Sequence, residues 1–269
     1  MGSDAFRVVV LGSATPYPRP GNPCSGHLVE GGGVRVWVDA GTGTLAELQR
    51  HVALGDIDAV WISHLHADHC ADLLTAYYAL LYAGLDVSVP VPLFGPAGIA
   101  DRLAGFLTNG PERSPVEKAF AVEELHDGHV ATVGGLTLRS RAVDHAGPDA
   151  FALRVESEDG RSFVYSGDCE PCPPLVELAR GCDLFFCEAD GAVPGHHTPA
   201  QAGLSAAAAG VGRLVVTHVG AGVEPGEAVA LAAAGFPGPV AHADPGAWFE
   251  VTRRSRTPGR TPTSPASSR

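Results

Sequence analysis

The chain has 269 residues, 45% of them hydrophobic, and a formal net charge of −12; this length allows one large core, and we expect one folded domain. No apolar run reaches the roughly 18 residues that span a bilayer, and the first residues, MGSDAFRVVVLGS, lack the features of a signal peptide, so we expect a soluble, cytoplasmic protein. The last seventeen residues hold five arginines and no acid, so the remaining chain carries a charge of −17, which argues against binding of long nucleic acids.

The first third of the chain has the pattern of a β-sheet. β-Branched residues gather in short runs between Gly and Asp, which predicts strands at 7–11, 27–30, 34–38 and 57–62. Apolar residues then recur three and four positions apart, as they do on one face of a helix. This spacing predicts helices at 44–54, 72–83 and 97–107.

The second part of the chain begins with strands and ends with helices. From about residue 120 to 165, short apolar runs alternate with turns such as Asp127-Gly128, which predicts an antiparallel meander. Helices at 175–180, 199–209 and 225–234 then alternate with strands at 184–187 and 214–217. Two halves of this kind predict an α/β sandwich of two sheets with helices on both outer faces.

The C-terminal segment, residues 252–269, differs in composition from the domain at 1–251. It is rich in Pro, Ser, Thr and Arg and has no apolar periodicity, so it cannot bury enough surface to order itself. We predict a disordered tail. An arm that binds an anionic partner is the functional alternative.

Six cysteines are dispersed through the chain, which is far larger than the secreted scaffolds that depend on disulfides. We therefore expect free thiols. Cys169 and Cys172 form a C-x-x-C, which fits either a redox or a metal pair. No second C-x-x-C accompanies it, and the neighbouring prolines at 171, 173 and 174 favour a simple turn.

The segment WISHLHADHCADL places four metal-binding side chains directly after a predicted buried strand: His64, His66, Asp68 and His69. Residues two apart in extended backbone face the same way, so His64 and His66 can bind one metal, and the following turn can direct Asp68 and His69 toward another. Imidazoles and a carboxylate suit Zn²⁺, with Mn²⁺ or Fe²⁺ as alternatives. A polar loop that is histidine-rich by chance is the structural alternative.

Further ligand-type residues follow other predicted strands. His145 follows the strand at 136–143, Asp168 ends 163–167 in YSGDC, and His218 ends 214–217 in VVTHV. With these residues the chain resembles the metallo-β-lactamase superfamily over roughly residues 6–251. The resemblance implies a four-layer αββα sandwich with the site along one edge of the sheets. It also implies two metal ions, one held by His64, His66 and His145 and one by Asp68, His69 and His218, with Asp168 bridging both.

Several positions narrow the branch of the superfamily. Ala67 stands where the flavodiiron oxygen-reducing branch has a Glu ligand, which disfavours that branch. Asp168 stands where many true metallo-β-lactamases have Cys, which disfavours a true metallo-β-lactamase. The opening VVVLGSATPYPRPGNPCSG and the segment HHTPAQAG resemble the RNase Z-like phosphodiesterase branch. Asp39, in WVDAGTG, resembles the superfamily carboxylate that orients a ligand histidine.

The HHTPAQAG segment also implies a histidine that supports the metal centre. Counted back from Gly203, the matching residue is His196, and its neighbour His197 is the alternative, since one residue of alignment error would exchange them. Surface histidines at a helix start capped by Thr198 are the structural alternative.

Longer phrases, LVELARGCDLFFCEAD and SGDCEPC, are similar to actinobacterial phosphodiesterases of this fold that hydrolyse cyclic nucleotides. Where most relatives read GDT, this chain reads Gly167-Asp168-Cys169. We find no long Gly-rich arm of the kind that grips transfer RNA, which disfavours an RNA 3′-processing endonuclease.

The function that this resemblance implies is hydrolysis of a small, anionic cyclic nucleotide by a metal-bridging hydroxide, with Asp68 and His196 as catalytic residues. Hydrolysis of a thioester or lactone on the same metal site is the first alternative. A noncatalytic metal-binding protein is the least favoured reading, because no ligand is missing. We expect a small-molecule substrate and no membrane partner; a homo-oligomer stays open. The pocket walls are expected from 16–25 and 77–110.

Overall fold

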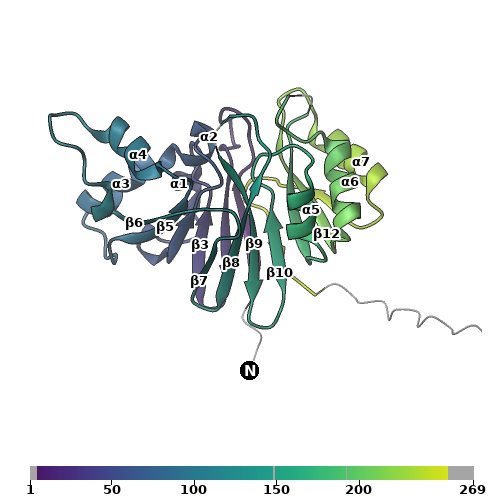
Figure 1. The fold of residues 1–269 in the computed structure, drawn as a ribbon, viewed down its shortest axis with the longest axis horizontal. Helices are drawn as coiled ribbons and strands as arrows, with labels where there is room; N and C mark the ends of the chain where they lie inside the picture. Colours follow the sequence, from purple (N-terminus) through teal and green to yellow (C-terminus); the bar gives the residue numbers. More distant parts are fainter. Residues whose placement is uncertain (1–4, 148, 192, 254–269) are drawn as a thin grey trace, which may run out of the picture.

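The computed structural model describes residues 5–147, 149–191 and 193–253. Its centre consists of two seven-stranded sheets that face each other (Figure 1). The first sheet has the order β14 (Trp248–Glu250), β1 (Arg7–Gly12), β2 (Gly26–Gly31), β3 (Val34–Val38), β4 (Ala59–Trp61), β5 (Val91–Gly95) and β6 (Phe120–Glu124). The second has the order β13 (Val240–His242), β12 (Arg213–Val219), β11 (Leu184–Ala189), β10 (Ser162–Tyr165), β9 (Ala150–Ser157), β8 (Leu136–Val143) and β7 (Val130–Val133).

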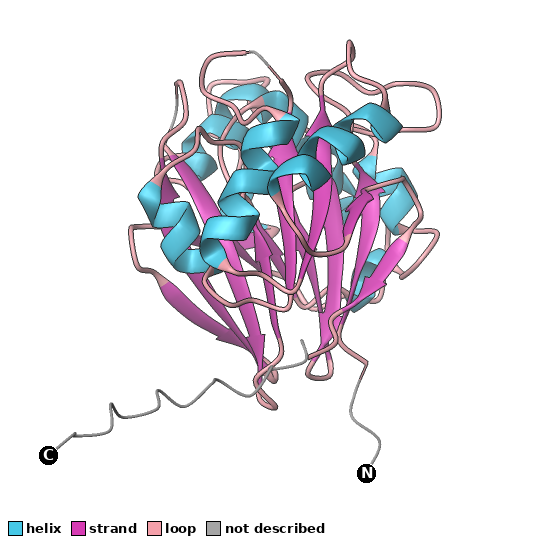
Figure 2. Cartoon of the chain, turned by 90° about the vertical axis from the view of Figure 1, so that its right-hand side faces the viewer, coloured by secondary structure: helices cyan, strands magenta, loops and turns pink. Residues whose placement is uncertain are grey.

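Helices cover the outer face of each sheet. The first sheet carries α1 (Thr44–Leu48), α2 (Ala67–Cys70), α3 (Asp72–Tyr82) and α4 (Ile99–Leu107), and the second carries α5 (Pro173–Ala179), α6 (Pro199–Ala209) and α7 (Pro225–Gly235). Figure 1 shows the two helical groups on opposite sides of the strands, and Figure 2 shows helices lying over the second sheet. The predicted four-layer αββα sandwich is confirmed.

The alternation of apolar side chains along β1 builds two of the core layers. Val8 and Val10 point between the sheets, where they pack in one cluster with Phe163 and Phe186. Val9 points the other way, into the layer that α3 and α4 cover. Because successive strand residues face opposite sides, a strand with apolar residues at every position must be buried on both faces.

Several predicted elements agree with the structure, and two differ. The boundaries of β3, β8 and α6 match the prediction, and α6 begins with a capping box in which Thr198 accepts a hydrogen bond from the Gln201 amide. The first helix was expected to run to residue 54 but ends at Leu48, because the chain must turn and becomes extended at Ala53 before it enters β4.

The strand at residues 120–124 was predicted to belong to the antiparallel meander, and this was wrong. It is β6, which pairs in parallel with β5 at the edge of the first sheet. The meander consists of β7 to β10 alone. Strands β5, β13 and β14 were not predicted. Strands β13 and β14 have only three residues each, which is too short for a clear apolar pattern.

No helix among the described residues is long and apolar enough to cross a membrane. Most of the predicted tail, residues 254–269, lies outside the described residues, so its disorder and the domain boundary at 251 stay predictions. Strands β8, β10, β11 and β12 run in the same direction, so their carboxyl ends meet at one edge of the second sheet.

Candidate metal centre

The seven predicted ligands come together at this edge. His64 and His66 lie in the extended segment between β4 and α2, and His66 is the N-cap of α2. Asp68 and His69 lie in the short helix α2 itself, which turns their side chains away from the extended pair. The other three come from the second sheet, at positions that follow β8 and β10 or lie in β12: His145, Asp168 and His218.

The three histidines predicted to hold the first metal present their ring nitrogens to one another. The Nε2 atom of His64 lies 3.0 Å from Nδ1 of His66, and Nε2 of His145 lies 3.3 Å from that same Nδ1. One ligand atom from each of the three residues falls within 4.8 Å of the others, which is close enough for a shared cation. The predicted group is therefore assembled in space.

The second predicted group is assembled in the same way. The Nε2 atoms of His69 and His218 lie 3.2 Å apart, and Oδ2 of Asp68 lies 3.3 Å from Nε2 of His218. Asp168 lies between the two groups: its Oδ2 is 3.7 Å from Nε2 of His64 and 3.2 Å from Nε2 of His69. This position suits a bridging carboxylate.

The donor set fits divalent cations for two physical reasons. Buried polar atoms normally have hydrogen-bond partners, yet Oδ1 of Asp168 and Nδ1 of His218 have none. Burial lowers the pKa of His64, which keeps that imidazole in the neutral form that binds metals. Within the described residues, every group of His, Cys, Asp or Glu side chains that could hold a metal includes at least one of the seven predicted ligands.

Asp39 lies behind the cluster, as the resemblance implies. Its Oδ2 lies 2.7 Å from Nδ1 of His69, which leaves Nε2 of that ring to face the other ligands. Asp39 also accepts hydrogen bonds from the Ser63 amide and hydroxyl and from the Tyr165 hydroxyl. These contacts hold the carboxylate, and therefore the His69 ring, in one orientation.

The structure separates the two candidate histidines of the HHTPAQAG segment. The His196 ring stacks on that of His218 with centroids 5.6 Å apart, and its Nδ1 lies 3.9 Å from Oδ2 of Asp168. His197 is fully buried and turned away; its Nδ1 donates to the Cys169 carbonyl and its Nε2 contacts Ser205. His196 is therefore the residue that lies at the cluster of predicted ligands, and His197 supports the loop behind it.

Glu188 is a site residue that the sequence reasoning did not single out. It is fully buried near the end of β11, and its Oε1 lies 3.0 Å from Nδ1 of His196. Burial alone would lower the pKa of His196, but the hydrogen bond and charge of Glu188 outweigh it and raise the pKa to about 9. The available signal was the acid in CEAD, a strand-end carboxylate like Asp168.

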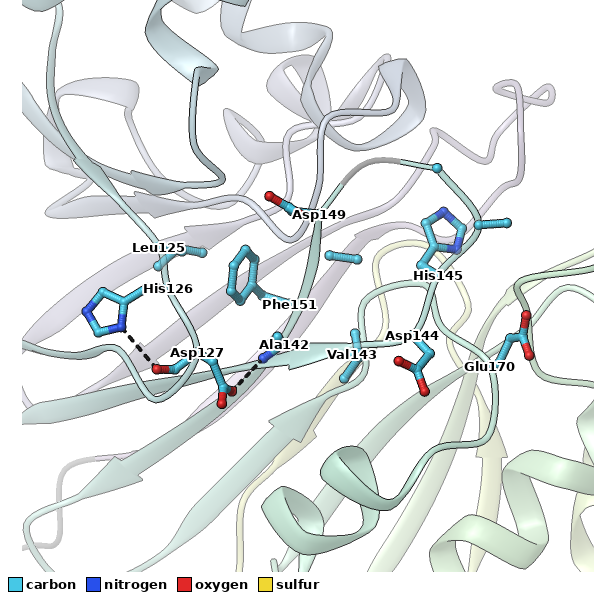
Figure 3. A pocket seen from close by; sticks show the side chains of 13 residues that line it. Leu125, His126, Asp127, Ala142, Val143, Asp144, His145, Asp149, Phe151 and Glu170 are labelled. Carbon is cyan, nitrogen blue, oxygen red and sulfur yellow. Dashed lines mark hydrogen bonds between the residues drawn. The ribbon is translucent and has the colours of Figure 1, made fainter.

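A pocket of about 700 Å³ opens beside His145 (Figure 3). Its walls come from the segment after β6, from the end of β8 and the start of β9, and from Glu170. Its ionisable lining residues are two histidines and four acids: His126, His145, Asp127, Asp144, Asp149 and Glu170. Neither of the two segments expected to form the pocket walls contributes to this pocket, because the segments that follow β6 and β8 line it instead.

Comparison with known proteins agrees with this architecture. Residues 34–219 match a family described as beta-lactamase superfamily domain. An uncharacterized protein of Mycobacterium tuberculosis, Rv1339, is 36% identical over 257 residues, which cover 93% of each chain. Ribonuclease Z of Mycobacterium marinum is 32% identical over 253 residues, which cover 79% of this chain and 86% of the relative.

Two solved structures show the same fold. The metallo-beta-lactamase fold protein YhfI from Bacillus subtilis superimposes with a TM-score of 0.80 at 24% identity, covering 92% of this chain and 100% of the other. A diphosphatase from the PhnP family superimposes with a TM-score of 0.70 at 19% identity, covering 93% and 99%.

The fold and the site define a metal-dependent hydrolase. The chain belongs to the metallo-β-lactamase superfamily and is similar within it to ribonuclease Z.

Proposed function

We propose that the protein hydrolyses a small phosphodiester, with a cyclic nucleotide as the leading candidate. The observation that carries this proposal is the hydrogen-bonded pair of Glu188 and His196 beside the predicted metal ligands. A phosphodiester leaves as an alkoxide, which needs a proton, and a protonated imidazole beside the reacting centre can deliver one. The similarity to ribonuclease Z supports the same class of reaction.

We further propose that the cluster holds two zinc ions, with manganese or iron as alternatives. His64, His66 and His145 would hold one, Asp68, His69 and His218 the other, and Asp168 would contact both. Bound divalent ions lower the pKa of water and screen negative charge on phosphoryl oxygens.

Two side chains of the protein would then carry out the proton transfers, one as donor and one as acceptor. Nδ1 of His196 is occupied by Glu188, so its Nε2 remains to donate to the departing oxygen. Asp68 is the ligand carboxylate with access to solvent, since 11% of its side chain is exposed against 2% for Asp168. We assign to Asp68 the uptake of the proton from the attacking water.

The charge of the site limits the size of the substrate. The pocket beside His145 is lined by four acids and by no Lys or Arg, and the chain as a whole has a net charge of −12. A polyanion would meet repulsion on this face, whereas one phosphodiester group can be compensated by bound metal ions. This favours a small substrate over long nucleic acid.

The test is hydrolysis of 3′,5′-cyclic AMP and bis(p-nitrophenyl) phosphate, beside a thioester and a lactone, by zinc- and manganese-loaded protein. We expect turnover of both phosphodiesters. His196→Ala should lower kcat for cyclic AMP by about 10²–10⁴-fold, because its alkoxide must be protonated, and lower kcat for the nitrophenyl ester far less.

His51→Ala provides the matched control, because His51 is an exposed histidine outside this pocket whose ion-pair partner is Glu47. It should leave both activities nearly unchanged. Turnover of the thioester or lactone alone would refute the phosphodiester assignment. Binding without any turnover would indicate the noncatalytic alternative, and equal losses on both phosphodiesters in His196→Ala would refute its role as proton donor.

A further inference from the structure

The predicted ligands that solvent reaches most readily lie beside the pocket of Figure 3. His66 and His145 are partly exposed, whereas the other five predicted ligands are buried. His145 itself lines the pocket, and so does Gly147, where an added Cβ would lie 3.4 Å from Nε2 of His66. A phosphodiester bound at these two histidines would therefore have its organic group at the mouth of the pocket.

The pocket has an apolar wall between two polar ends. Figure 3 shows Leu125 and Phe151 in the middle of the lining, with His126 on one side and His145 on the other. Leu125 and Phe151 are each only 5% exposed, so the surrounding core fixes their positions. The volume of about 700 Å³ falls within the range of small-ligand sites, roughly 300–1,000 Å³. A flat heteroaromatic ring can lie against such a wall, where contact with the phenyl ring favours it.

Asp149 is the acid beside this apolar wall. It lies two residues before Phe151 at the start of β9, and residues two apart in extended backbone face the same way. Within the described part of the chain, no hydrogen bond or ion pair engages its carboxylate. Asp127, by contrast, accepts a hydrogen bond from the Ala142 amide at 3.0 Å and lies 3.3 Å from Nε of Arg141. An ionised carboxylate only accepts hydrogen bonds, so Asp149 favours a ring edge that carries a donor.

We propose that this pocket binds the base of the nucleotide, and that Asp149 selects a base with an amino group at its ring edge over one with a carbonyl there. The inference rests on the phosphodiesterase function proposed above. The amino group of adenine can donate to the Asp149 carboxylate, whereas the carbonyl of hypoxanthine would place two acceptors against each other. Asp149 is therefore a specificity residue and takes no part in bond cleavage.

The test compares 3′,5′-cyclic AMP with 3′,5′-cyclic IMP, which carry an amino group and a carbonyl at the same ring carbon. For the metal-loaded full chain, kcat/KM should be about 10- to 100-fold higher for cyclic AMP. Asp149→Asn supplies an amide that can donate to the carbonyl, so it should lower kcat/KM for cyclic AMP and raise it for cyclic IMP, each by about tenfold. Damage to the fold would lower both values.

A second measurement does not depend on turnover. Calorimetric titration of the zinc-loaded protein with 5′-AMP and 5′-IMP should show tighter binding of AMP, and Asp149→Asn should reverse this preference. Glu227→Gln is the matched control, because Glu227 is an exposed acid on α7 that does not line the pocket. It should leave both the binding preference and the kcat/KM ratio as they are in the unmodified protein.

Failure of this inference can be distinguished from failure of the proposed function. Turnover of phosphodiesters with equal kcat/KM for the two cyclic nucleotides would overturn the role of Asp149 and leave the phosphodiesterase standing. Equal losses on both nucleotides in Asp149→Asn would overturn it as well, and so would a switch produced by Glu170→Gln instead. Without turnover of any phosphodiester the proposed function would fail, and a reversal of the AMP preference by Asp149→Asn would still support the base pocket.

Discussion

A buried histidine predicts how the stability of the fold depends on pH. His27 lies on β2 between the sheets, with its ring centroid 5.0 Å from that of Tyr165 and 5.1 Å from that of Phe186. Neither ring nitrogen has a hydrogen-bond partner. Burial, with a smaller contribution from the charge of His69, lowers the pKa of His27 to about 3.

The sign of this pH dependence follows from the difference in proton binding between the folded and unfolded chains. In the unfolded chain His27 takes up a proton below a pH of about 6.5, whereas in the folded protein it stays neutral until about pH 3. The unfolded state therefore binds more protons in this window, and the free energy of unfolding falls as the pH drops through it. Between pH 8 and pH 5 the loss attributable to His27 is about 2 kcal/mol.

His27→Phe should remove this loss, because a phenyl ring fits among Tyr165 and Phe186 and cannot take up a proton. The assay is urea unfolding of the metal-free protein at pH 8 and pH 5, so that metal release does not contribute. The difference in unfolding free energy between variant and unmodified protein should change by about 2 kcal/mol between the two pH values. An unchanged difference would refute the reasoning, and the exposed His51→Gln serves as control.

Three further changes test the site and the packing around it. Asp168→Ala should abolish stable metal loading and turnover, measured as metal content after gel filtration; full activity would contradict the bridging position. Asp39→Ala should lower metal affinity by about 10- to 100-fold in a chelator competition, because the His69 ring loses its orientation, and unchanged affinity would count against that role. Gly203→Ala should destabilise the fold by about 1–3 kcal/mol in urea unfolding, because its Cβ would lie 2.1 Å from the Ala232 carbonyl oxygen. The matched Gly105→Ala, where a Cβ meets nothing within 4 Å, should be neutral or stabilising, and equal effects of the two would refute the close helix contact.

The ligand cluster could be predicted because its information is local. Each ligand of the second sheet follows or ends a strand, and parallel strands bring such ends to one edge whatever their order. The order itself is not local: nothing in the residues 120–124 says that they pair with β5 and not with β7. The apolar pattern therefore predicted a strand there and assigned it to the wrong sheet.

Residues that support the ligands were harder to find than the ligands. Tyr165 reads as a core aromatic within a strand, and only the structure shows its hydroxyl 2.8 Å from Asp39. In the sequence Glu188 is one of thirty acidic residues and nothing distinguishes it from the others. In the structure burial raises the pKa of Glu188, and its carboxylate is hydrogen-bonded to His196. Such roles depend on contacts between distant segments, which a single sequence does not encode in any short motif.

The backbone at the site carries a further sign of function that the sequence could not reveal. Among the described residues, the only non-glycine residues with positive φ are Asp39, at 57°, and His218, at 49°. Each such conformation costs on the order of 1 kcal/mol and persists only where surrounding contacts fix it. Asp39 has four such contacts, and His218 is held among Asp68, His69 and Asp168. A glycine at either position would relax the backbone but remove the side chain. The strain is therefore best explained by the need to direct Asp39 toward His69 and His218 toward the other predicted ligands.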